Sequence, residues 1–502
     1  MRYSLVEVPV RTRALMLALP LLGLPAPAST QVVPVKTVPV AAGDQFLLFP
    51  STSMSMGGVS LALVDTLGDP FVNPGTGGRL HGSLFFGAPT FYHVSDGNGS
   101  GRTLPVGTIF RSGDWFGGGG VSLQEVEGAK REQWLLTPGS WGNRPQSLSE
   151  RSARNLYAFG ILGHRFADAR LSVGISGLWA DLGAMDGVDL LYAMSQEIHQ
   201  SGTLSDLRVG VLKEWEGERS LELLLLRSKL RMTHDVTYVD LVWTAEDPYT
   251  GPIPRWMARA EKNLDHTDTW GAHLVYRRPL GSPGWKIGWS LTGNWKNHPK
   301  IPNYEIQNIP RDPGNTRAYG LGVGLSKVEG PTRLAVEMAL EPIRSETWAD
   351  AAADTVSVMG EVIESGERTV ENDFRFTNLL VRAGGSWEYR RATFRGGIQV
   401  RSIAYELEQF NRVEAVRRNQ DESWMEWSPS VGISLDLGGA VLHYAGRVTT
   451  GTGRPGVQWT AERAAMLDLA AATDFILAPA GPLTLQDARV TTHQFSVAIP
   501  VR

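Results

Sequence analysis

The chain has 502 residues, an apolar share of 42 % and a formal net charge of −4. The weak negative charge gives no electrostatic sign of nucleic-acid binding. No apolar run is long enough for a membrane-spanning helix, which excludes a helical membrane protein. The absence of cysteine excludes a disulfide scaffold and a cysteine-ligated zinc site.

The N-terminus has the pattern of an export signal. Arginines near the start are followed by the apolar run Ala14–Leu24 and by the small-residue sequence Ala26–Ala28. This apolar run is too short to span a bilayer. We therefore expect residues 1–28 to be a signal peptide and the mature chain to begin near Ser29.

The next segment, residues 29–78, differs in composition from the rest of the chain. Residues 31–42 are rich in valine and proline, which predicts an extended conformation. Residues 43–78 are rich in small residues and methionine and end at Asn73–Gly75, a sequence typical of a chain reversal. We expect residues 29–78 to form an N-terminal extension that precedes the main fold.

From about residue 79 to residue 502 one pattern repeats. In Ala318–Ser326 the large apolar residues alternate with glycine and serine. Since successive side chains of a strand point to opposite faces, one face is apolar and the other is small and polar. About sixteen such stretches predict an all-β fold, a transmembrane antiparallel β-barrel of 14–16 strands with lipid outside and water inside.

The expected strands follow one another in pairs along the chain. In order they are Leu80–His93, Thr103–Phe110, Trp115–Leu123, Leu156–Phe166, Arg170–Asp181, Leu204–Trp215, Leu221–Thr233, Thr269–Arg277, Trp285–Asn297, Arg317–Lys327, Arg333–Arg344, Phe374–Tyr389, Thr393–Glu408, Trp424–Leu437, Val441–Thr449 and Thr491–Val501.

The connections between these strands alternate in length. Tight turns alternate with long segments at Gln124–Asn155, Asp235–Asp268, Ser345–Asn372 and Gly451–Val490. Barrels of bacterial outer membranes show this parity, with short periplasmic turns and long extracellular loops. The pattern predicts a location in the outer membrane of a Gram-negative-type bacterium, where lipid surrounds the barrel.

The two faces of the strands support this interpretation. The set Leu171, Val173, Ile175 and Trp179 and the set Leu334, Val336, Met338 and Leu340 are expected to face lipid. Charged residues are expected in the wet lumen, among them Arg170, Lys286, Arg333 and Glu337. A soluble two-sheet sandwich remains the alternative, but it predicts no alternation of short and long connections.

The stretch before the first strand carries a motif, in Ser55–Asp65 and Asp69–Gly75. It resembles the N-terminal signature of the outer-membrane long-chain fatty-acid transporter family and of its secretion-associated relatives. The matching positions are Gly57, Gly58, Asp65, Asn73 and Pro74. The departures are Ser60, Leu61 and Gly75, together with a single acid where the family has two. The resemblance covers only about twenty residues.

This resemblance implies a fourteen-stranded barrel plugged by an N-terminal hatch, with a lateral gap through which apolar ligands reach lipid. Residues 43–78 would then lie inside or across the periplasmic mouth. Apolar contacts to a ligand would come from Met54, Met56, Leu61, Leu63 and Phe71. Packing against the lumen wall explains these five residues equally well, and Asn73–Gly75 also fits a plain turn before a strand.

No motif of a known catalytic or metal site is present. The sequence contains no G-x-S-x-G, H-E-x-x-H, phosphate-binding loop or EF-hand. The pair Asp265–His266 with Asp268 falls in an expected loop without partner carboxylates, and the acids of residues 361–371 fit a solvated face. We therefore predict no catalytic residue, no metal and no cofactor.

Three functions stay open on the sequence alone. Passive uptake of hydrophobic small molecules, such as long-chain fatty acids, follows from the resemblance. A structural barrel would instead hold a protein partner through its long extracellular loops. A general-diffusion porin would pass polar solutes along the expected lumen charges.

Overall fold

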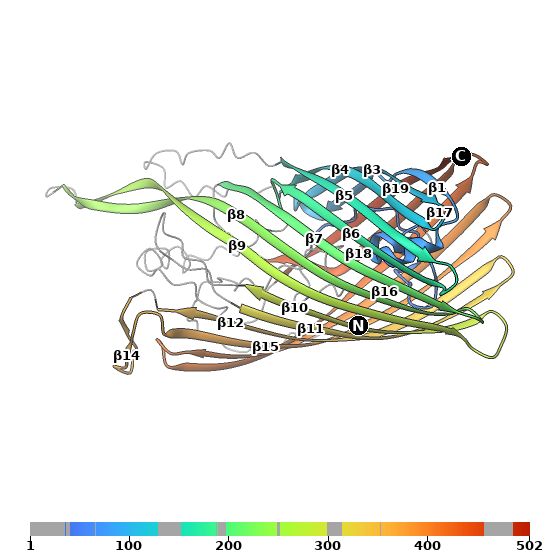
Figure 1. Ribbon diagram of the computed structural model, residues 1–502. Coiled ribbons are helices and arrows are strands. Elements are labelled where there is room, and N and C mark those ends of the chain that lie inside the picture. Colours follow the sequence, from blue (N-terminus) through green and yellow to red (C-terminus); the bar gives the residue numbers. More distant parts are fainter. Residues whose placement is uncertain are drawn as a thin grey trace, which may run out of the picture.

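The computed structural model describes residues 36, 41–65, 67–128, 152–186, 188, 197–247, 251–298, 314–351, 353–455 and 485–501. The expected signal peptide lies outside these residues. The described strands close into a single antiparallel barrel of sixteen strand positions (Figure 1). This closure confirms the predicted all-β barrel and excludes the soluble sandwich.

The strands have the following bounds: β1 Ser83–Gly87, β2 Thr90–Val94, β3 Ser100–Ser112, β4 Trp115–Glu127, β5 Ser152–Phe166, β6 Leu171–Leu182, β7 Glu197–Trp215, β8 Arg219–Asp247, β9 Gly251–Pro279, β10 Trp285–His298, β11 Gly314–Glu329, β12 Thr332–Asp350, β13 Thr355–Val356, β14 Val362–Ile363, β15 Arg368–Tyr389, β16 Ala392–Asn411, β17 Val416–Asp436, β18 Val441–Pro455 and β19 Leu485–Val501. The helices are short: η1 Ser53–Met56, α1 Asp69–Val72, η2 Pro74–Arg79 and η3 Ser95–Gly97. None of the helices among the described residues is long and apolar enough to cross a membrane.

The barrel closes where the last strand meets the first. β1 and β2 share one strand position, because each pairs with β19 on one side and with β3 on the other in an unbroken register. The prediction of one continuous strand over Leu80–His93 is wrong, because Ala88 and Pro89 separate β1 from β2. Proline has no N–H to give to the ladder, so a strand tends to break there. With this pair counted once the barrel has sixteen positions, not the fourteen that the resemblance implies.

The strand faces follow the predicted alternation. Ile175 and Trp179 are exposed on the outer wall, whereas the intervening Ser176 and Leu178 are buried. On β12 the predicted apolar set is exposed and Glu337 is buried inside. The prediction that Arg170 faces the lumen is wrong. Arg170 lies in the turn before β6 with a φ of 46°, and its guanidinium pairs with Glu216 outside the lumen.

Two of the expected long loops are largely strands. β8 and β9 run through most of Asp235–Asp268, and β12 and β15 extend into Ser345–Asn372. Beyond the membrane both faces of a strand meet water or protein, so the apolar alternation fades while the backbone ladder continues. Asp265, His266 and Asp268 accordingly lie in a strand and not in a loop.

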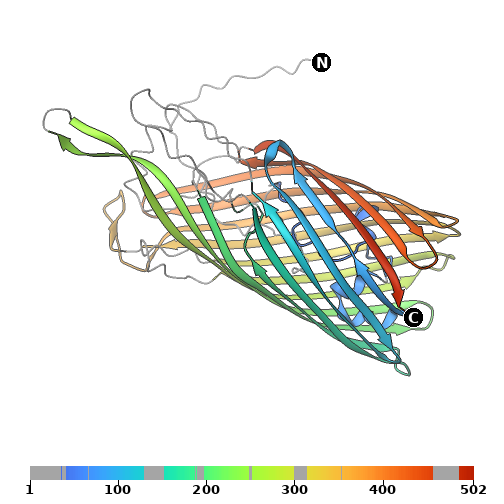
Figure 2. The same ribbon diagram turned by 90° about the horizontal axis from the view of Figure 1, so that it is seen from above.

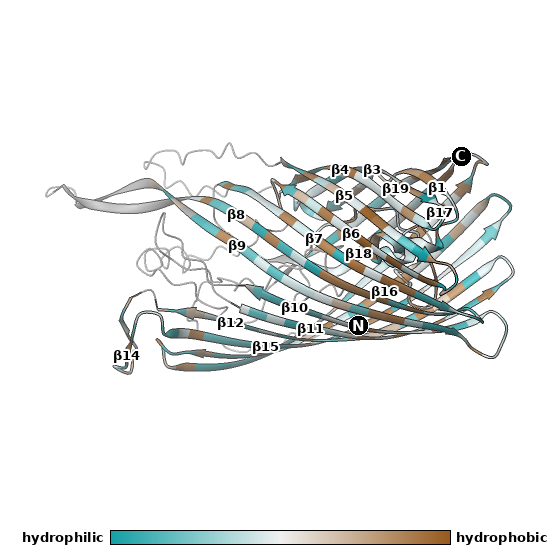
Figure 3. Cartoon of the chain, viewed as in Figure 1, coloured by the Kyte–Doolittle hydropathy of each residue, from teal (hydrophilic) through white to brown (hydrophobic). Residues whose placement is uncertain are grey.

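The outer surface marks the position of the bilayer. On the outward face of β10, Trp285 and Trp295 lie ten positions apart. At 3.3 Å per residue and a tilt of about 40°, this separation gives a rise of about 25 Å, the height of the apolar band of outer-membrane barrels. In Figure 3 the strand ends toward the long loops turn hydrophilic. The chain is an outer-membrane protein, with its short turns toward the periplasm.

Candidate functional site

The segment before β1 lies inside the barrel, near the end with the short turns (Figure 2). We call residues 43–78 the hatch. Its first helix, η1, packs against β15–β18, and its last, η2, packs against β4–β8 on the opposite wall. The hatch therefore crosses the lumen from one side to the other.

Glycines of the wall make room for the backbone of the hatch. A Cβ atom at Gly397 would lie 2.2 Å from the carbonyl carbon of Met56, and one at Gly384 would lie 2.1 Å from the Met56 oxygen. On another part of the wall, a Cβ at Gly288 would lie 2.5 Å from the carbonyl oxygen of Leu61. No larger residue fits at these positions while the hatch is in place.

The opposite wall holds the second half of the hatch in the same way. A Cβ at Gly210 would lie 2.0 Å from Oδ1 of Asn73, and one at Gly174 would lie 2.5 Å from the carbonyl oxygen of Pro74. The Asn73 side chain also accepts a hydrogen bond from the N–H of Gly75 (3.0 Å), which begins η2 with Pro74 as its first residue.

The remaining motif residues build the turns of the hatch. Gly57 and Gly58 have φ of 70° and 80°, the left-handed region that favours glycine, and end η1. Asp65 accepts hydrogen bonds from the N–H groups of Thr52 and Gly68, both at 3.1 Å. This carboxylate therefore ties two distant turns of the hatch together.

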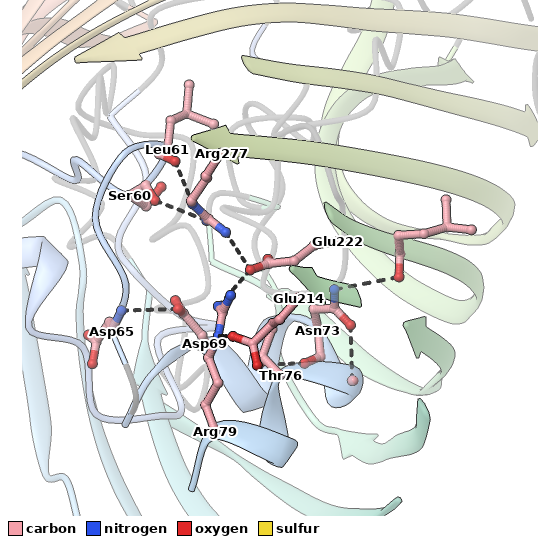
Figure 4. Close-up of polar contacts among 12 residues, drawn as sticks. Ser60, Leu61, Asp65, Asp69, Asn73, Thr76, Arg79, Glu214, Glu222 and Arg277 are labelled. Atoms are coloured by element: carbon pink, nitrogen blue, oxygen red, sulfur yellow. Dashed lines mark hydrogen bonds and ion pairs between the residues drawn. The ribbon is translucent and has the colours of Figure 1, made fainter. Parts of the chain in front are cut away.

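Buried ion pairs fasten the hatch to β8 and β9 (Figure 4). Arg277 donates to the carbonyl oxygens of Ser60 (3.2 Å) and Leu61 (2.5 Å) and also pairs with Glu222. Glu222 in turn accepts from Arg79 of η2 at 2.8 Å. Because a buried charge without its partner is costly, these pairs fix both halves of the hatch.

Asp69 begins α1 and accepts a hydrogen bond from the N–H of Asp65 (3.0 Å). Burial, with the carboxylates of Asp65 and Glu222 nearby, raises the pKa of Asp69 to about 8. The docked hatch therefore holds this carboxyl protonated, whereas an undocked Asp ionises above a pKa of about 4. The resulting contribution to docking is complete below about pH 4 and is lost as the pH rises through about 8.

We expect Asp69→Asn to remove this pH dependence, since the amide keeps an oxygen that accepts from Asp65 but cannot ionise. In limited proteolysis of the purified barrel, the wild-type hatch should become more cleavable from about pH 6 to about pH 9 relative to the variant at each pH. Parallel profiles for the two proteins would show that Asp69 does not titrate in this range.

An apolar crevice lies between the hatch and the wall. Its free volume is about 10 Å³, room for about one water molecule, so a larger ligand has to displace part of the lining. Its lining carries no charge and consists of Leu48, Phe49, Phe86, Pro105, Val106, Gly120, Val121, Ser122, Tyr157, Phe159 and Leu178. Most of these side chains point inward, but Val106 and Val121 are 37 % and 52 % exposed on the outer face. The crevice therefore lies against the paired strands β3 and β4, whose residues Val106 and Val121 carry their side chains on the outer face.

Aromatic rings fill the inner side of this crevice. The ring of Phe49 stacks on Phe71 at 4.3 Å and meets Phe159 edge-on at 4.8 Å. Phe86 of β1 meets Phe71 at 5.2 Å. Rings in these arrangements offer an apolar surface that a hydrophobic molecule can occupy without leaving a polar group unpaired.

The wall beside the crevice is poor in side chains. Gly119, Gly160 and Gly177 are register partners on β4, β5 and β6 and form a bare strip. A Cβ at Gly160 would have nothing within 4 Å, so no neighbouring side chain covers this strip. Gly119 of this strip belongs to the glycine run Gly117–Gly120 of β4.

The seam between β1/β2 and β3 lacks one hydrogen-bond donor. The N–H of Ala88 donates to the carbonyl oxygen of Pro105 (3.1 Å), but Pro105 has no N–H to return. The backbone of Pro89 faces β19 instead, where its carbonyl oxygen accepts from the N–H of Phe495 (2.9 Å). Since Pro105 also lines the crevice, the weakest pairing of this seam lies directly beside the apolar space.

An amide network closes the crevice toward the long-loop end. The hydroxyl of Tyr157 donates to Oε1 of Gln124 at 2.8 Å, and Asn155 donates to the same oxygen at 2.8 Å. Gln45 of the hatch donates to the carbonyl oxygen of Ala184 at 2.8 Å. The Ser122 hydroxyl, buried in the crevice, has no hydrogen-bond partner among the described residues.

The structure does not bring the five expected ligand residues together. Only Phe71 lies in the aromatic cluster of the crevice. Met56 and Leu63 pack with Ala335 of β12, and Leu61 lies over the β10 and β11 glycines on that other side of the lumen. Sequence reasoning missed Phe49, Phe86, Tyr157 and Phe159. The signal for the last three was a large aromatic residue on an otherwise small and polar inner strand face.

Comparison with known proteins gives structural neighbours only. No family model matches the sequence, and no curated protein matches it. A FadL homologue of Pseudomonas aeruginosa is 10 % identical with a TM-score of 0.42, over 93 % of this chain and 100 % of that chain. The toluene transporter TbuX of Ralstonia pickettii is 12 % identical with a TM-score of 0.38, over 91 % and 100 %. The ferric enterobactin receptor PfeA of Pseudomonas aeruginosa is 9 % identical with a TM-score of 0.32, over 83 % and 81 %.

The first two neighbours are outer-membrane transporters of the kind that the hatch motif resembles. A siderophore receptor stands beside them at a similar score. The structural neighbours therefore do not identify the ligand of this chain, which has to be inferred from its own residues.

Proposed function

We propose that this protein takes up hydrophobic small molecules passively across the outer membrane, past the hatch and out through the wall beside the crevice. The single observation that carries this proposal is the uncharged crevice, whose lining includes the aromatic rings of Phe49 and Phe159 and the outward-facing Val106 and Val121. An apolar molecule gains about 25 cal/mol per Å² of surface removed from water along such a path.

Long-chain fatty acids are one cargo that fits. Their chains match the apolar lining, and the unpartnered Ser122 hydroxyl offers one hydrogen bond to a polar end. No cation lines the crevice to hold a carboxylate tightly. Release into lipid therefore needs no strong ion pair to be broken.

The filled lumen weighs against a general-diffusion porin. The hatch crosses the lumen, and its pairs with Arg277 and Glu222 are buried rather than solvated. Lys36 also reaches into the lumen, where it pairs with Glu426 of β17. Polar solutes would have to displace these contacts.

A partner-binding barrel is the second candidate, favoured by one observation. The hairpin of β13 and β14, on the long-loop side, exposes several large apolar side chains. These are Val356, Val358, Met359 and Val362. A protein partner would cover such a tip.

Uptake by intact cells tests the proposal. A Gram-negative host without its own uptake proteins for these compounds should accumulate labelled oleate and naphthalene when it produces this protein. Proteoliposomes that contain the purified barrel should stay closed to sucrose. Sucrose entry without a gain in oleate uptake would overturn the proposal in favour of a porin, and entry of none of the compounds would favour partner binding.

A further inference from the structure

Three cations follow one another on the outer face of β8. Arg227, Lys229 and Arg231 occupy successive outward positions, and the residues between them, such as Ser228, point inward. They come directly after the outward leucines that end with Leu225. The charge therefore begins where the apolar surface of this strand stops.

These cations have a single carboxylate beside them among the described residues. Asp268 of β9 lies 2.9 Å from Arg231 and 3.6 Å from Arg227. The outward neighbours on β7, Thr203 and Ser205, are neutral hydroxyls. Farther out, Asp235 of β8 faces Lys262 of β9, so that pair adds no net charge.

A fourth cation lies in the same register row, displaced from Arg227 by about 9 Å along the barrel axis because the strands are tilted. Arg227, Trp270, Trp295 and Arg317 are register partners in one row across β8, β9, β10 and β11. Three strand spacings place Arg227 and Arg317 about 14 Å apart. On β8–β11 four cations therefore face one carboxylate, and Arg344, opposite Arg317 on β12, is paired with Glu346 and Asp373.

The row lies at the outer edge of the apolar band. The guanidinium of Arg227 lies over the ring of Trp270 at 4.6 Å, and Trp295 meets Tyr319 at 6.3 Å. Tryptophan and tyrosine gather where hydrocarbon meets headgroups. The exposed Leu291 and Leu321 continue the apolar surface toward the periplasm.

Two other arginines of the rim have carboxylate partners of their own. Arg102 pairs with Glu125 at 3.0 Å, and Arg344 binds Asp373 with two hydrogen bonds of 3.1 Å. Arg227, Lys229 and Arg231 of β8, which share only Asp268, thus have fewer carboxylate partners than these two arginines.

We propose that this surface of β8–β11 binds the phosphate-bearing headgroup of an anionic lipid in the outer leaflet. Arginine and lysine side chains bind phosphate oxygens through charge-assisted hydrogen bonds. The acyl chains would lie on the leucines below the tryptophans. A soluble anion would not need cations placed at the edge of an apolar band, so the position selects a lipid.

The test compares two triple variants of the full-length purified barrel. Arg227→Gln, Lys229→Gln and Arg317→Gln remove the excess charge and leave the Arg231–Asp268 pair intact. Arg102→Gln, Arg154→Gln and Arg489→Gln remove the same charge from the other side of the rim. Native mass spectrometry counts the lipid A molecules that each protein retains, and circular dichroism checks the strand content.

Wild type and the rim control should retain diphosphorylated lipid A, and the β8–β11 variant should lose at least tenfold in occupancy at equal lipid concentration. Lipid A without phosphates should be lost from all three proteins. Equal retention by the β8–β11 variant, or equal retention of dephosphorylated lipid A by wild type, would overturn the proposal. Neither outcome depends on whether the barrel transports hydrophobic molecules.

Discussion

Replacing Gly397 by valine is expected to release the hatch and open the lumen to polar solutes. The new Cβ would lie 2.2 Å from the carbonyl carbon of Met56 and 2.4 Å from the nitrogen of Gly57. Both are backbone atoms and cannot rotate away, so hatch docking should weaken by at least the 1–3 kcal/mol typical of an overpacked core. Proteoliposomes with this variant should admit sucrose, to which the wild-type barrel stays closed.

The neighbouring residue offers a matched control. Gly396 lies on the outer face of the same strand, where a Cβ would have nothing within 4 Å. Gly396→Val should therefore leave the proteoliposomes closed and the hatch resistant to protease. If the two variants behaved alike, the glycines of the lumen wall would not be what holds the hatch.

A disulfide across the weak seam is expected to abolish uptake of hydrophobic molecules. The chain has no cysteine, so Pro89→Cys with Leu104→Cys introduces a single pair. The two positions lie opposite each other between β2 and β3, next to the Ala88–Pro105 hydrogen bond. Directly opposite residues lie within the distance range that a disulfide spans. Oxidised cells should lose oleate uptake, and a reductant should restore it.

A disulfide elsewhere in the wall separates closure of the seam from general stiffening. Val323→Cys with Met338→Cys links β11 to β12 at an outward register pair far from the crevice. Uptake should be unchanged in this variant. Undiminished uptake in the oxidised Pro89–Leu104 variant would place the exit elsewhere, whereas loss in both variants would point to a motion of the whole barrel.

The barrel could be predicted from the sequence because lipid imposes a strict rule on one face of each strand. Wherever this rule acts, as along Leu334–Leu340, the predicted face is confirmed. In β8 beyond Asp235 the rule no longer applies and the apolar alternation fades, so this part of the strand was predicted as a loop. The break at Pro89 was not predicted, because β1 and β2 keep the same register with β19 on both sides of it.

The hatch was recognised by its motif, but its attachment could not be predicted. The positions of Gly210 and Gly397 in separate strands look alike in the sequence, and only the fold shows which hatch atom each one meets. The ion pair of Glu222 with Arg277 joins residues 55 positions apart, through a register that the sequence does not reveal. The crevice likewise depends on rings from β1, β5 and the hatch that meet only in three dimensions.

The two-sided attachment of the hatch also constrains the order of assembly. Gly174 and Gly210, which receive Asn73 and Pro74, belong to the first half of the barrel, whereas Gly384 and Gly397 belong to the second half. The hatch precedes every strand in the chain, so it can settle against the early strands while the late ones are still being added. Its other half finds its place only once β15 and β16 have formed. The complete set of hatch contacts therefore exists only in a barrel that already contains both halves.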